Sequence, residues 1–155
     1  MLPLLTRLDH VGIACRDLDR AVALYQATFG LEVASLEVNE EQGVREAMLA
    51  VGGLTAGGSP VSGVAGDRPG YVQLLEPLSS DTPVGKFIAR RGEGLHHVGY
   101  GVADIGEALT AIGGTGLRLI DERPRHGSMG ASIAFLHPGD LGGVLTELVQ
   151  FVSPA

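Results

Sequence analysis

The chain of 155 residues has the size of one ordinary domain, and 45% of its residues are apolar, which suffices for a packed core. Its net charge of −7 argues against a nucleic-acid binder, because neutralising phosphates requires a basic face. No apolar run has the ~18 residues that a membrane-spanning helix needs, the N-terminus lacks a signal-peptide pattern, and the single cysteine, Cys15, excludes an intrachain disulfide. These features predict a cytoplasmic protein without nucleic-acid or membrane partners.

The sequence contains an internal repeat. Leu8–Gly12 (LDHVG) matches Leu95–Gly99 (LHHVG), and the residues that follow each segment also match. Such self-similarity is typical of a duplicated structural unit. We therefore predict two modules, residues 1–92 and 93–155, that together form one compact domain.

The first module is predicted to begin with a strand at Leu8–Ala14. A helix follows, capped at its start by Asp17 and ended by Gly30, with apolar residues at helical spacing between these caps. The Gly-rich stretch Gly53–Gly70 is predicted to be a loop or insertion. Three further strands of this module are predicted near Glu32–Val38, Val44–Val51 and Tyr71–Leu75.

A helix at Pro83–Arg91 is predicted to link the modules, with its proline in the first turn and Gly92 after its end. The second module repeats the plan, with a strand at His97–Val102 and a helix that Asp104 caps and Gly113 ends. The predicted fold class is α+β, with two βαβββ modules whose sheets share a cleft. The remaining strands are predicted near Arg118–Asp121, Ala131–Leu136 and Gly143–Val149.

The first strand of each module carries a histidine, His10 or His97, with only small residues two and four positions further along the same face. A lone histidine on a strand is more often a hydrogen-bonded structural residue, but its recurrence at matched positions favours a ligand. His96 is the rival of His97, and the alignment with His10 favours His97. His126 and His137 lie in Gly- and Pro-rich sequence and are interpreted as loop residues.

The last strand of each module has one polar residue at the centre of an apolar run, Gln73 in the first and Glu147 in the second. Burying such a residue without a partner is costly. Two imidazoles, a carboxylate and an amide oxygen suit Co²⁺, Mn²⁺, Ni²⁺, Zn²⁺ or Fe²⁺ better than a thiolate-selective metal. We predict that His10, Gln73, His97 and Glu147 bind one divalent metal ion, Co²⁺ in first place, in a metal-centred cleft with open positions for catalysis.

These motifs belong to longer segments that carry a family resemblance. The chain resembles the vicinal-oxygen-chelate superfamily, whose members pair βαβββ modules around a divalent metal, and within it the methylmalonyl-CoA epimerase family. The run Glu41–Glu46 (EQGVRE) is the most specific to the epimerases. The resembling segments are Leu8–Ala14, Asn39–Met48, Val72–Leu78, Gly94–Val98, Phe135–Pro138 and Gly143–Leu148.

The resemblance implies that the positions of His10, Gln73, His97 and Glu147 are metal ligands. It also implies that Glu46 is a catalytic acid/base and that Glu147 is both a ligand and the second acid/base. The implied enzyme is an isomerase that inverts C2 of methylmalonyl-CoA, or of a close malonyl thioester. Such a reaction needs Lewis-acid stabilisation of an enolate and bases on both faces of C2.

From the residues alone, two interpretations of Glu46 stay open. It shares a strand face with Val44 and Met48, so it fits a base in an apolar cleft. It fits equally a solvated charge that pairs with Arg45 or Lys86.

Two departures from the family pattern bear on the substrate. Ser132 and Gly139 stand where the epimerases usually carry basic residues, so the acyl group could be carried on CoA or on a carrier protein. The alternative functions are a glyoxalase- or dioxygenase-like enzyme of the same fold and a metal-free small-molecule binding protein. We expect a small acyl-CoA substrate. We also expect a homodimer, because dimerisation often covers exposed strand edges.

Overall fold

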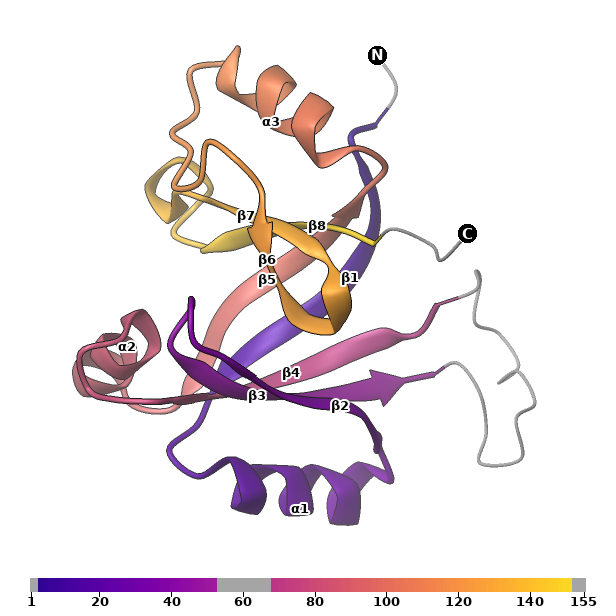
Figure 1. The fold of residues 1–155 in the computed structure, drawn as a ribbon, viewed down its shortest axis with the longest axis vertical. Coiled ribbons are helices and arrows are strands. Elements are labelled where there is room, and N and C mark those ends of the chain that lie inside the picture. Colours follow the sequence, from indigo (N-terminus) through magenta and orange to yellow (C-terminus); the bar gives the residue numbers. More distant parts are fainter. Residues whose placement is uncertain (1–2, 53–67, 152–155) are drawn as a thin grey trace. The chain divides into compact units, whose positions relative to one another are not determined.

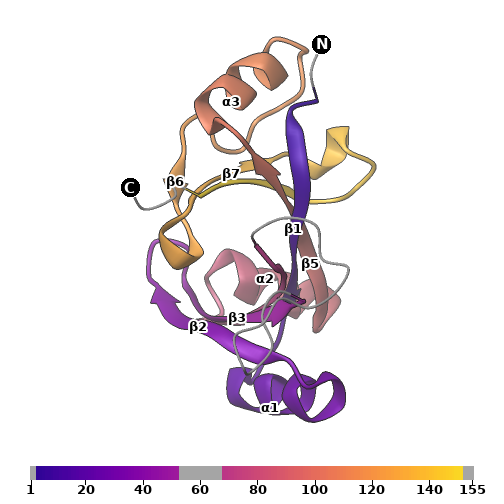
Figure 2. The same ribbon diagram turned by 90° about the vertical axis from the view of Figure 1, so that its right-hand side faces the viewer.

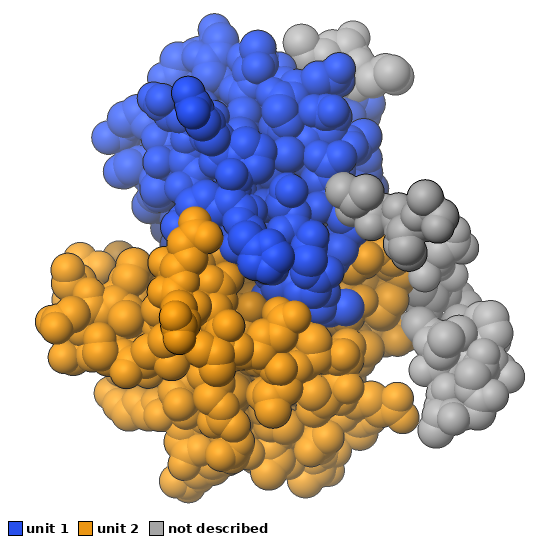
Figure 3. Space-filling view, in the orientation of Figure 1, with its two compact units in different colours: residues 1–9, 97–155 blue, residues 10–96 orange. Residues whose placement is uncertain are grey.

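The protein is α+β, as the sequence predicts, with helices packed on β-sheets (Figure 1). The computed structural model describes residues 3–52 and 68–151, so most of the predicted Gly53–Gly70 insertion lies outside the described residues. The chain divides into two compact units, coloured in Figure 3: unit 1 comprises residues 1–9 and 97–155, and unit 2 comprises residues 10–96. The division falls inside two strands, β1 (Leu5–Ala14) and β5 (Gly94–Val102).

Unit 2 combines its part of β1 with the elements α1 (Leu18–Phe29), β2 (Glu32–Asn39), β3 (Val44–Val51), β4 (Gly70–Pro77) and α2 (Pro83–Arg91). Its strand order is β2-β3-β4-β1, in which β1 runs parallel to β4 and the other pairs are antiparallel. Helix α1 covers one face of this sheet (Figure 1), where Leu18 packs with Cys15, Ala47, Leu49 and Leu74.

Unit 1 combines its part of β5 with the elements α3 (Ile105–Gly113), β6 (Arg125–His126), β7 (Ser132–Leu136) and β8 (Thr146–Gln150), and with two single 3₁₀ turns, η1 (Ser128–Gly130) and η2 (Pro138–Asp140). Its strand order is β5-β8-β7-β6, with β5 parallel to β8 and the other pairs antiparallel. Helix α3 covers one face of this sheet (Figure 2), where Leu109 packs with Ala134 and Leu148. The βαβββ plan predicted from the repeat therefore occurs in both units.

The predicted helix caps are confirmed in detail. The Asp17 side chain accepts a hydrogen bond from the Arg20 N–H, and Asp104 accepts one from the Glu107 N–H. Gly30 ends α1 in the left-handed conformation at φ +67°. Helix α3 runs one residue further than predicted, with Gly114 as its C-cap. None of the described helices has the length and apolar character that crossing a membrane requires.

One predicted strand is wrong. Arg118–Asp121 forms only a single isolated bridge, to Leu136, and the strand beside β7 is the two-residue β6. Two successive N–H groups, those of Ile120 and Asp121, donate to one carbonyl, that of Phe135. A regular ladder gives each carbonyl its own donor, so the backbone here is irregular.

Cys15 is buried under α1, and its thiol donates to the Leu75 carbonyl at 3.5 Å. Burial, with a smaller contribution from the charges of Glu76 and Glu93, raises the pKa of this thiol to about 12. Because the thiolate is the reactive form, we expect Ellman's reagent near pH 8 to modify the folded protein about 10³-fold more slowly than the urea-unfolded protein. Stopped-flow absorbance measures both rates, and equal rates would contradict a buried, protonated thiol.

Candidate functional site

In unit 2 the predicted ligands lie on one face of the sheet. Gln73 on β4 is the parallel partner of Gly12 on β1, and His10 lies two residues before that glycine. Cross-strand partners and alternate residues of one strand share a face. His10 and Gln73 therefore project from neighbouring strands to the same side, and each is only 5% exposed.

Glu46 on β3 lies on this face too. Met48, two residues further on, is the cross-strand partner of Gln73. The Glu46 Oε2 atom accepts a hydrogen bond of 2.9 Å from the Gln73 Nε2, and the Glu46 side chain is buried with 1% exposure. Glu46 is therefore no solvated strand charge, and Arg45 pairs instead with Asp19, at 2.6 Å.

Helix α2 covers one end of the same face. Its residues Val84 and Ile88 pack on Ala14, Val44 and Leu75. Each of these three lies two or four residues from a site residue of its own strand, so it shares the face of that residue. Apolar side chains therefore border the Glu46 carboxylate, and water is kept from that side of it.

The position of Glu46 is apolar in unit 1. Glu46 on β3 pairs with Leu75 on β4, and at the corresponding point Ile133 on β7 pairs with Val149 on β8. Ile133 belongs to a packed apolar cluster. The sheet does not require a carboxylate at this position, and burying one is unfavourable without a specific partner, so Glu46 serves a purpose other than packing.

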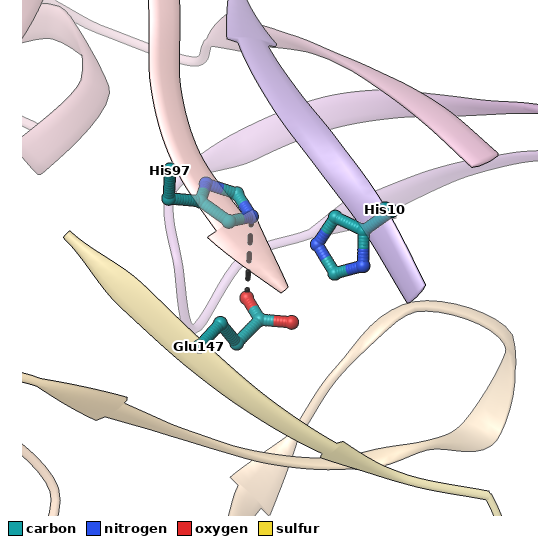
Figure 4. Close-up of side chains that lie close together, drawn as sticks. All are labelled: His10, His97 and Glu147. Carbon is teal, nitrogen blue, oxygen red and sulfur yellow. Dashed lines mark ion pairs between the residues drawn. The ribbon is translucent and has the colours of Figure 1, made fainter. Parts of the chain in front are cut away.

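In unit 1, Glu147 on β8 is the parallel partner of Gly99 on β5, and His97 lies two residues before that glycine. Figure 4 shows the two side chains reaching toward each other from neighbouring strands, with His97 Nε2 and Glu147 Oε2 3.4 Å apart. Both are buried. Two atoms held to one ion by bonds of about 2.1 Å lie roughly 3.0–3.4 Å apart when the bonds enclose 90–110°, so this separation fits a shared ion.

Sequence reasoning did not single out Phe135. This residue on β7 is the cross-strand partner of Glu147, and its ring stands against the His97 imidazole at 5.4 Å between centroids and 85° between planes. Its contact with His97 depends on the pairing of β7 with β8, and the corresponding position of unit 2, opposite Gln73, holds Met48.

The other histidines have different surroundings. The His96 ring packs edge-on against Phe87 at 5.0 Å, and burial lowers its pKa to about 4. The His137 Nδ1 atom accepts a hydrogen bond of 3.0 Å from the Gly139 N–H in turn η2. His126 is exposed on β6.

The two departures from the epimerase pattern lie away from the site face of unit 1. A Cβ atom at Gly139 would lie 2.7 Å from Nη2 of Arg118, so the Arg118 guanidinium fills the space beside this glycine. That guanidinium donates to both oxygens of Asp140, at 3.0 and 3.1 Å, and holds the pKa of the carboxyl down to about 2. On β7, Phe135 and Ile133 share the face of Glu147, and Ser132 directly precedes Ile133. The Ser132 side chain therefore lies on the opposite face, which α3 covers.

Comparison with known proteins identifies the family. The sequence pattern of the Glyoxalase/Bleomycin resistance protein/Dioxygenase superfamily matches residues 9–135. The chain is 33% identical to the mitochondrial methylmalonyl-CoA epimerase of Bos taurus over 147 residues, which cover 94% of this chain and 75% of that protein.

Solved structures agree in fold and sequence. A variant of Streptomyces coelicolor methylmalonyl-CoA epimerase in complex with 2-nitronate-propionyl-CoA has a TM-score of 0.85 and 50% identity, over 96% of this chain and 99% of that one. A methylmalonyl-CoA epimerase in complex with methylmalonyl-CoA and NH4+ has the same TM-score and identity, over 96% of each chain. The resemblance found in the sequence is confirmed: the chain belongs to the Glyoxalase/Bleomycin resistance protein/Dioxygenase superfamily and, within it, to the methylmalonyl-CoA epimerase family.

Proposed function

We propose that this protein is a metal-dependent epimerase that interconverts the C2 stereoisomers of methylmalonyl-CoA. One observation carries the proposal: the candidate ligand atoms of His10, His97 and Glu147 form a group in which all lie within 4.8 Å of one another. Membership of the epimerase family supports the choice of reaction. The buried carboxylate of Glu46, hydrogen-bonded to Gln73, supports an acid/base beside this group.

Four side chains are proposed to hold one divalent ion: His10, Gln73, His97 and Glu147. The Gln73 amide nitrogen donates to Glu46, so the ligand atom of Gln73 is its amide oxygen. Two imidazoles and two oxygen donors suit first-row divalent ions, and we propose Co²⁺ before Mn²⁺, Ni²⁺, Zn²⁺ or Fe²⁺. When bound, the ion supplies Lewis-acid stabilisation of the negative charge that develops on the thioester as the C2 proton leaves.

The residues of the chain move the proton. Glu46 takes or returns the C2 proton on one face of the substrate, and Glu147 does so on the other. The hydrogen bond from Gln73 to the Glu46 Oε2 atom orients the carboxylate. The apolar side chains under α2 exclude water that would otherwise solvate this carboxylate.

Hydrogen exchange at C2 tests the proposal. In D₂O, the metal-loaded protein should place deuterium at C2 of methylmalonyl-CoA, as measured by mass spectrometry. A chelator should stop the exchange, and added Co²⁺ should restore it. If the metal-loaded protein leaves the C2 hydrogen in place, the epimerase assignment fails. Turnover of the methylglyoxal–glutathione adduct, or oxygen uptake with Fe²⁺ and a catechol, would then indicate another activity of the superfamily.

We further propose that the protein acts in the cytoplasm, as a homodimer, on the CoA ester rather than on an acyl carrier protein. The single cysteine supports a reducing compartment, and the acyl-CoA ligands bound to related epimerases support the CoA ester.

A further inference from the structure

We propose that Phe135 is a positioning residue for the metal site of unit 1. It holds the His97 imidazole and the Glu147 carboxylate in the orientation in which both reach one ion. This inference rests on the proposed function, because it takes these two side chains as ligands.

The Phe135 ring is placed to act on both ligands. As the cross-strand partner of Glu147, it stands on the same face of the sheet, with Cβ atoms about 5 Å apart. Its ring is perpendicular to the His97 imidazole, at 85° and 5.4 Å between centroids, which is the preferred edge-to-face geometry of aromatic pairs. The ring is 8% exposed and packs in a cluster with Ile133 and Val149, so it is itself held in place.

This contact matters because the groups around an imidazole ring set the direction of its nitrogens. A perpendicular ring hinders rotation of the His97 side chain about its Cβ–Cγ bond. It thereby keeps Nε2 aimed at Glu147, at the 3.4 Å separation that fits a shared ion. Without the ring the imidazole has more orientations available, and fewer of them point toward the ion.

Unit 2 offers a natural substitute for the ring. Met48 occupies the corresponding position, opposite Gln73, and is 2% exposed. A methionine therefore packs at this point of the module, although its flexible thioether orients a neighbour less firmly than a ring does. Phe135→Met removes the ring and leaves apolar volume in place.

The experiment measures metal binding of the full chain without substrate. Phe135→Met should bind Co²⁺ roughly 10-fold more weakly than the wild type in a titration, which is the size of effect seen for residues that orient ligands. The visible absorption spectrum of the Co²⁺-loaded variant should change, because the ligand geometry changes. Phe135→Tyr, which keeps the ring, should restore both affinity and spectrum.

The control is Leu136→Ala. Leu136 neighbours Phe135 in sequence and is also buried, but it packs in a cluster with Leu109 of α3 on the other side of the sheet. This variant should unfold at lower temperature yet bind Co²⁺ within about twofold of the wild type, with an unchanged spectrum.

Three results would overturn the inference. Phe135→Met could bind Co²⁺ with wild-type affinity and spectrum, or Leu136→Ala could weaken binding as much as Phe135→Met does. A wild-type protein that binds no divalent ion would overturn the proposed function and this inference with it. A wild type that binds Co²⁺, but no better than Phe135→Met does, would overturn this inference alone. If the methionine variant does not fold, Phe135→Leu provides a second variant without the ring.

Discussion

Replacing Glu46 by glutamine is expected to lower the rate of epimerisation by about 10²–10⁴-fold, the usual contribution of a positioned general acid or base. Glutamine has nearly the same shape and can still pair with the amide of Gln73, but it cannot accept the C2 proton. Chiral separation of the two methylmalonyl-CoA epimers measures the rate. Metal content should stay at the wild-type level, because Glu46 is not a proposed ligand.

The proposed pair of bases, Glu46 and Glu147, leads to a sharper expectation for the same variant. Glu147 should still exchange the C2 hydrogen of one epimer and return it to the same face. In D₂O, Glu46→Gln should therefore label one epimer and leave the other unlabelled. Glu93→Gln is the matched control, because Glu93 is an exposed carboxylate of unit 2, 3.9 Å from Arg16, and should behave like the wild type. Labelling of both epimers at wild-type rates would exclude Glu46 as an acid/base.

Replacing Glu147 by alanine should remove both the metal and the activity. Residues that merely orient ligands contribute 10–100-fold to metal affinity, so loss of a direct carboxylate ligand should weaken binding by at least about 100-fold. Elemental analysis of the untagged protein should find about one equivalent of a divalent ion in the wild type and almost none in this variant. The exchange of deuterium into C2 should disappear with it.

Glu147→Gln separates the two roles proposed for this residue, metal ligand and acid/base. Its amide oxygen can serve as a ligand, as proposed for Gln73, so part of the metal should remain bound. Its amide cannot carry the proton, so epimerisation should stop. Asp140→Asn, which removes the carboxylate paired with Arg118 on the surface of unit 1, should keep full metal content and activity. Full metal content in Glu147→Ala would show that Glu147 is not a ligand.

Much of the fold was predictable because its signals are local. The side chains of Asp17 and Asp104 cap helices through their own first turns, and β3 has the bounds that its run of residues indicates. The repeat added a second signal, because matched positions in the two modules carry similar residues and so predict the same elements. The face on which His10 or His97 lies was predictable from the alternation of side chains along its own strand.

What the sequence could not show depends on contacts between distant segments. The segment Arg118–Asp121 has the composition of a strand, but Asp140, far along the chain, accepts a hydrogen bond from the Arg118 N–H at 3.0 Å, and the Asp121 side chain accepts one from the Phe135 N–H at 2.9 Å. These carboxylates take the place of backbone hydrogen bonds that a regular ladder would make. From the sequence, Glu46 fits a surface charge as well as a buried base, because it follows an arginine. The register between β3 and β4, which sets Glu46 beside Gln73, decides between the two. The ring of Phe135 meets His97 only through strand pairing that no local pattern reveals.

The contrast between Glu46 and Ile133 bears on why two modules are joined in one polypeptide. An ancestral assembly of two identical chains would have had to place the same side chain at both positions. Covalent fusion of duplicated genes lifts that symmetry, so one copy can acquire a proton acceptor while the other keeps a hydrocarbon. A substrate with dissimilar ends, such as an acid joined to a thioester, does not call for the same side chain at both positions.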